Sequence, residues 1–249
     1  MTKEIRNENV EKLEVGTIYF IVKPKVNQEK LSGEEDIQRF HMVLAPKDTR
    51  QFRSIIVGHK KLPGITEHNR YWGYVNALYQ SEEKFHQEFE GGEHETKTRG
   101  TQHEDPARVA GEGVYAFVTH GDHTHFIYEL NQPRDTGEVQ EDLNIKPEGS
   151  YIVSVKNPKR GAPKSAGLPR TENVEYPQNL QQLFDDKRFI SVSDTKLLDY
   201  EGAEVVLIGS QEEVSKELGI ELDENKRYHE LHLDKGSLEK KPMKEGKWQ

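Results

Sequence analysis

Short apolar runs, bounded by glycine, proline and charged residues, dominate the hydrophobic pattern of this 249-residue chain. Runs of this length that are rich in β-branched and aromatic residues are typical of β-strands rather than helices. We therefore predict strands at residues 16–24, 39–45, 52–58, 114–120, 123–130, 150–156, 203–209 and 227–233, and a strand or short helix at 70–78. The pattern favours a fold built mainly on strands.

Helical periodicity is confined to a few short segments. Residues 81–90 combine Ser81 as N-cap with Phe85 and Phe89 on one side, and glycines follow at 91–92. Weaker helical patterns follow at residues 177–188 and 210–219, and single turns are indicated at 32–35 and 194–200. Together the elements predict an α+β fold, mainly an antiparallel β-sheet or a partly open barrel, with three or four peripheral helices.

Residues 91–112 are polar and contain no predicted strand. A link of this length inside a compact domain is often either functional or disordered. We expect one α+β domain over residues 1–234, with 91–112 as the place where it would divide. The polar residues 235–249 are expected to form a flexible tail.

The clearest local pattern covers residues 113–130, where two alternating runs flank a glycine and an aspartate at 121–122. Such a two-residue link predicts a tight β-hairpin turn and places His120 opposite His123. One face then carries Val114, Ala116, Val118, His120, His123, His125, Ile127 and Glu129. The other carries Tyr115, Phe117, Thr119, Thr124, Phe126, Tyr128 and Leu130. We expect this aromatic face to point into the core.

Imidazoles at His120, His123 and His125 suggest a site for a divalent transition metal, since each offers one neutral nitrogen. Glu129 on the same face is the candidate fourth ligand or general base, and a metal-activated water would supply the chemistry. The alternative is that these histidines are solvated polar residues at the tip of a hairpin.

Two short stretches bear on this metal hypothesis: His-x-His followed by glutamate at 123–129, and Pro-x-Gly at 147–149. Together they resemble part of the metal-binding motif of the cupin family. The resemblance implies a cupin barrel whose metal is held by these histidines and the glutamate. The family's fourth ligand, a histidine, falls on Ile152, and its upstream glycine falls on Phe117. His120 is our own candidate for the missing ligand.

Composition narrows the functional classes. The chain has a formal net charge of −9 and no cysteine. Disulfides, thiolate metal sites and cysteine nucleophiles are therefore excluded, and binding of nucleic acid over a broad surface is disfavoured. The polar start of the chain and the lack of a long uncharged run predict a cytoplasmic protein that does not enter a membrane.

Two loops are basic despite the negative net charge, at residues 96–108 and 156–170. Cationic side chains among glycines can hold a phosphate-bearing ligand or nucleic acid. The candidate ligand-binding residues are Lys97, Arg99, Arg108, Lys156, Lys159 and Arg160. The alternative is that both are ordinary solvated loops.

Several catalytic and cofactor motifs are missing. The sequence has no Gly-x-Ser-x-Gly elbow, no nicotinamide- or flavin-binding Gly-x-Gly-x-x-Gly and no phosphate-binding P-loop. Three hypotheses therefore stay open: a metal-dependent enzyme, a binding module for a phosphate-bearing ligand, and a structural or protein-interaction module.

Overall fold

The computed structural model describes residues 10–96, 100–161, 174–211, 222, 228 and 238–248. Its strands are β1 (Glu11–Pro24), β2 (Ile37–Pro46), β3 (Phe52–Val57), β4 (Arg70–Tyr79), β5 (Gly92–Thr96), β6 (Gly100–Glu104), β7 (Arg108–His120), β8 (His123–Gln132), β9 (Glu148–Lys156), β10 (Phe189–Ser191) and β11 (Glu204–Gln211). Its α-helices are α1 (Glu82–Phe89), α2 (Glu138–Asp142), α3 (Gln178–Gln182) and α5 (Lys241–Glu245), and its 3-10 turns are η1 (Glu34–Asp36) and η3 (Thr195–Leu198).

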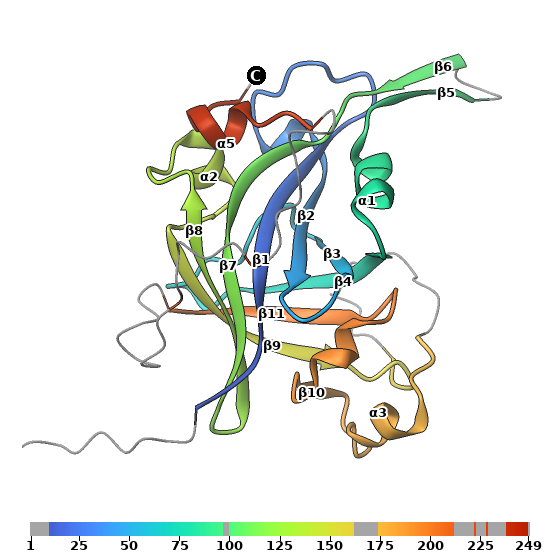
Figure 1. Cartoon of the computed structure of the whole chain (residues 1–249), viewed down its shortest axis with the longest axis vertical. Coiled ribbons are helices and arrows are strands. Elements are labelled where there is room, and N and C mark those ends of the chain that lie inside the picture. The colour runs from blue at the N-terminus through green and yellow to red at the C-terminus, as the bar shows by residue number, and fades with distance from the viewer. Residues whose placement is uncertain are drawn as a thin grey trace, which may run out of the picture.

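Eight of the nine strands in the main sheet close into an antiparallel β-barrel (Figure 1). β1 to β4 pair in chain order, and β7, β8 and β9 do the same. β1 joins the two meanders by pairing with β7, and β11 joins them on the other side by lying between β4 and β9. β10 pairs with the last residues of β9. Each barrel strand has a partner on both sides, so the ring has no open edge.

The expected α+β class is therefore wrong, and the sheet is closed rather than flat or partly open. Among the described residues the longest α-helix, α1, has 8 residues, whereas β1 has 14 and β7 has 13. Closure depends on pairings between distant segments, such as β1 with β7 and β11 with β4, which a local hydrophobic pattern does not specify. No described helix is long and apolar enough to cross a membrane.

Residues 91–112 are not the strandless link that we expected. They contain β5 and β6, which pair only with each other in the described chain, and the first residues of β7. β5 and β6 contain no aliphatic residue and no Phe, Tyr or Trp, so the alternation that identifies a half-buried strand is missing from them. We call this two-stranded unit the ribbon.

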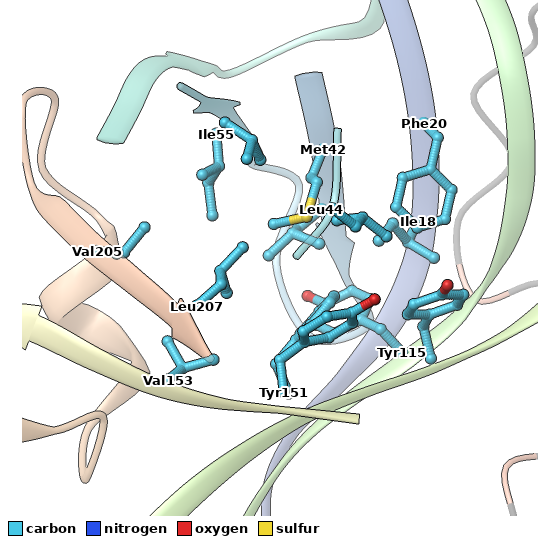
Figure 2. Packing of buried hydrophobic residues seen from close by; sticks show 14 of the residues in the cluster. Ile18, Phe20, Met42, Leu44, Ile55, Tyr115, Tyr151, Val153, Val205 and Leu207 are labelled. Atoms are coloured by element: carbon cyan, nitrogen blue, oxygen red, sulfur yellow. The ribbon is translucent and has the colours of Figure 1, made fainter. Parts of the chain in front are cut away.

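Side chains from all eight barrel strands fill the barrel interior, and Figure 2 shows part of this packing. In β1, Ile18 and Phe20 point inward, while Tyr19 and Ile21 belong to a second cluster on the outer wall. Burial of both faces explains why this strand reads as an almost continuous apolar run. The interior retains an apolar cavity of about 10 Å³, which lacks the polar partners that an ordered water needs.

Short elements cover part of the outer wall. α1 begins at Ser81, whose hydroxyl accepts from the backbone N–H of Lys84, as the sequence predicted. It buries Phe85 and Phe89 against the barrel. The predicted polar tail contains Met243 of α5, which is 2% exposed and packs in the same cluster. The described part of that segment, residues 238–248, is thus packed against the barrel.

Candidate functional site

The predicted hairpin forms in the predicted register. β7 and β8 pair with His120 opposite His123 and Val118 opposite His125. The aromatic face lies in the barrel core, with Tyr115, Phe117, Phe126 and Tyr128 all buried there. The histidine face lies on the outside of the barrel.

The three histidines differ in their surroundings. His125 is 8% exposed, and its Nδ1 lies 3.1 Å from the hydroxyl of Ser150 on β9. The ring of His120 lies 6.0 Å from that of His125. His123 is exposed at the turn, with Nε2 3.3 Å from the carboxylate of Asp122. The structure thus brings His120 and His125 together and leaves His123 facing solvent.

Glu129 does not join the histidines. It lies four residues along β8 from His125, a distance of about 13 Å in an extended strand. The buried Ile127 lies between them, and Glu129 pairs with Glu148 of β9. Among the described residues, no three or more histidine and carboxylate side chains are placed to hold one metal ion. The metal site and the catalytic role of Glu129 therefore stay predictions.

The cupin resemblance meets two differences. Ile152, which stands where that family has its fourth ligand, pairs directly with His125 across β8 and β9. The position is adjacent to the histidines, but an isoleucine side chain cannot bind a metal. The barrel is also built from two meanders, whereas cupins are jelly rolls with Greek-key connections.

Two of the predicted phosphate-binding cations are buried in structural contacts. Arg108 is 3% exposed; one of its Nη atoms donates to the backbone oxygen of Glu29 at 2.7 Å. Lys156 is 6% exposed, and its Nζ lies 3.3 Å from a carboxylate oxygen of Glu204. Since both cations already face protein acceptors, neither presents its charge to a ligand at the surface.

The remaining predicted cations do not form one patch. Lys159 and Arg160 are exposed after β9, where Arg160 lies 3.3 Å from Asp186. Lys97 and Arg99 lie outside the described residues. The ribbon that flanks them stands at one end of the molecule, and β10, beside the end of β9, stands at the other (Figure 1). The two basic loops thus do not meet in the part of the chain that is described.

Sequence reasoning missed an ionic cluster inside the barrel, at the end where β1 and β3 begin. Arg53 is 2% exposed; its Nη1 lies 2.6 Å from Glu14 and its Nε 2.7 Å from Asp199. The Tyr115 hydroxyl donates to the same Glu14 oxygen at 2.8 Å. The sequence does contain a signal for this cluster. Arg53 alternates with Ile55 in an apolar strand and so lies on its core face, where a charge needs a buried partner.

Electrostatics keep this cluster paired. Burial lowers the pKa of the Arg53 guanidinium, but Glu14, Tyr115 and Asp199 together more than offset this and raise the pKa above its ordinary value. Burial also raises the pKa of Tyr115 well above its usual range, so its hydroxyl stays protonated and donates. Both cation and phenol are committed to protein carboxylates, and we assign the cluster to stability.

The ribbon projects away from the barrel (Figure 1). Asn27 closes the outer edge of β6, because its backbone N–H donates to the oxygen of His103 at 2.8 Å and its side chain accepts from the His103 N–H at 2.9 Å. Among the described residues, no strand pairs with the outer edge of β5.

An open hollow of about 350 Å³ lies at the base of the ribbon. Both strands and the residues beside them line it, among them Glu90, Glu93 and Glu104. The ribbon therefore combines a strand edge that the described residues leave uncovered with a hollow at its base lined by glutamates. Comparisons with models of protein families, with curated proteins and with solved structures find no match for this chain.

Proposed function

We propose that this protein is a binding module whose recognition element is the β5–β6 ribbon. The observation that carries the proposal is the ribbon itself: a two-stranded unit outside the barrel, with an outer β5 edge that no strand of the described residues covers. A two-stranded hairpin is marginally stable in water by itself. An exposed edge is also a template for pairing with another chain, and a partner that pairs with it would stabilise both.

The barrel supports this function as a rigid base. Its interior is filled by side chains, and the apolar cavity that the described residues line there, about 10 Å³, is far below the several hundred cubic ångströms that a small organic ligand needs. Storage of such a ligand inside the barrel is therefore disfavoured. Recognition by an outer element that a closed barrel holds in place is the better match to the geometry.

Replacing residues 93–103 by an Asn-Gly turn tests this function. None of the described ribbon side chains belongs to the core, so we expect the variant to melt within about 2 °C of the wild type. We also expect it to lose the partner that tagged wild-type protein retains from its own cells. A control variant carries the same Asn-Gly turn at residues 121–122 and keeps the partner. Retention of the partner by the ribbon variant would refute the proposal.

A second candidate function is binding of a divalent metal by His120 and His125. Two imidazoles on one tetrahedral zinc have ring centres about 5 Å apart, and these rings are 6.0 Å apart. Ser150 holds Nδ1 of His125, which is the kind of outer contact that orients a metal-binding imidazole.

Thermal melting in added zinc or nickel tests this candidate. We expect stabilisation by about 2–3 kcal/mol at a metal concentration a hundredfold above Kd. The stabilisation disappears in His120→Ala and persists in His123→Ala, because only the former removes a paired imidazole. An equal loss in both variants would instead favour the three-histidine site that the sequence predicted, and no stabilisation of the wild type would exclude both.

A further inference from the structure

The geometry points to the class of partner: a polypeptide segment with lysine or arginine at alternate positions, added as a third strand along the outer edge of β5. This inference rests on the proposed function of the ribbon and identifies what the ribbon binds. It follows from which backbone groups of the ribbon point outward, and from the charge along the same edge.

The hydrogen-bond phase shows which backbone groups point outward. The backbone N–H and C=O of His103 both bond Asn27, on the outer side of β6. They therefore point away from β5, and the pair of His103 with Glu93 is a non-hydrogen-bonded pair of the ribbon. Antiparallel pairs alternate between the two kinds, and the pair of Glu95 with Thr101 is therefore of the same kind. The backbone N–H and C=O groups of Glu93 and Glu95 consequently face away from β6 and form the docking edge.

The charge of this edge selects the partner. Glu93 and Glu95 are exposed and, two residues apart, place their carboxylates on one face of β5. A strand that bonds to their backbone groups places its own alternate side chains beside these carboxylates. Lysine or arginine at those positions is complementary, and the hollow lined by Glu90 and Glu104 extends the negative charge at the inner end of the edge.

Self-pairing of two β5 strands centred on His94 is disfavoured. If two β5 strands paired antiparallel about His94, Glu93 of each copy would stand opposite Glu95 of the other. Like charges at directly opposed positions destabilise a strand pair, and charged side chains on an exposed edge are a recognised barrier to self-association. The same carboxylates that oppose self-pairing favour a basic strand.

Synthetic peptides provide the test. The probe is a peptide of alternating lysine and threonine, titrated into isotopically labelled full-length protein, with affinity and backbone amide shifts as readouts. Two control peptides are used. In one, glutamate replaces lysine, which reverses the charge. In the other, alternate backbone nitrogens are methylated, which keeps the charge and removes hydrogen-bond donors. The protein variant is Glu93→Gln with Glu95→Gln, and its matched control removes two exposed carboxylates elsewhere, Asp48→Asn with Glu141→Gln.

We expect the probe to shift the amides of β5 and to protect those of Glu93 and Glu95 from hydrogen exchange. The double glutamine variant binds about tenfold more weakly, the matched control binds as the wild type does, and neither control peptide binds. Equal binding of the methylated peptide, or an equal loss in the matched control, would reduce the effect to general attraction and overturn the inference. No binding of the lysine peptide, while the natural partner still depends on the ribbon, would overturn the partner class and leave the proposed function standing.

Discussion

Replacing Arg53 by methionine is expected to lower the free energy of unfolding by about 3–5 kcal/mol. The guanidinium is 2% exposed and bonds Glu14 and Asp199 at 2.6 and 2.7 Å. Its removal leaves Glu14, whose side chain is only 11% exposed, with Tyr115 as a hydrogen-bond donor but without its cation. The expected loss of stability therefore measures the cost of burying the unpaired Glu14 carboxylate. It does not measure the net contribution of the ion pair to folding.

Urea unfolding at neutral pH measures this loss. The matched control is Arg39→Met, which removes an exposed arginine from β2 and should change stability by less than about 0.5 kcal/mol. A second variant, Glu14→Gln with Arg53→Met, also removes the unpaired carboxylate and is expected to recover part of the stability. Equal effects of Arg53→Met and Arg39→Met would show that the cluster does not support the barrel.

The second large effect is a loss of stability in acid that depends on His41. This side chain is 1% exposed on the outer wall; its Nδ1 lies 2.9 Å from the Ser54 hydroxyl and its ring 5.1 Å from that of Phe89 on α1. Burial, together with the charges of Lys23 and Arg39, lowers the pKa of His41 from 6.5 to about 3. The folded protein therefore holds this imidazole neutral under conditions in which the unfolded chain protonates it.

The direction of the pH effect follows from that difference. The contribution of His41 is complete above pH 6.5 and falls as the pH drops toward 3, because the unfolded state then binds the extra proton. Between pH 7 and pH 4.5 the loss is about 2–3 kcal/mol. Unfolding curves at several pH values measure it, and His41→Gln should remove this slope, whereas His59→Gln at an exposed position should keep it. Identical slopes in wild type and His41→Gln would contradict the assignment.

Secondary-structure elements were predictable where a short segment of sequence contains all the residues that determine them. The hairpin register followed from the turn at 121–122 and the alternation around it, and it was confirmed as His120 opposite His123. α1 was predictable from Ser81 together with the spacing of Phe85 and Phe89. Closure of the barrel was not predictable in this way, because it depends on partners that are far apart in the sequence.

The candidate site was the harder part. The ribbon was missed because the residues of β5 and β6 are polar throughout, so their strand structure comes from pairing with each other and not from burial. Arg108 and Lys156 were chosen as ligand-binding cations from charge alone, and a count of charges does not show that both side chains are buried. Arg53 was predictable as part of a buried ion pair, because it places a charge on the inward face of an apolar strand.

Site-specific cross-linking tests the central claim most directly. A photo-activated cross-linking residue is placed at Thr101 on the ribbon or at Asp48 in the turn between β2 and β3, both of which are exposed. In the protein's own cells, we predict a discrete adduct with one partner from position 101 and none with that partner from position 48. Adducts with the partner from position 48 alone, or equal yields from both positions, would show that the ribbon is not the recognition element.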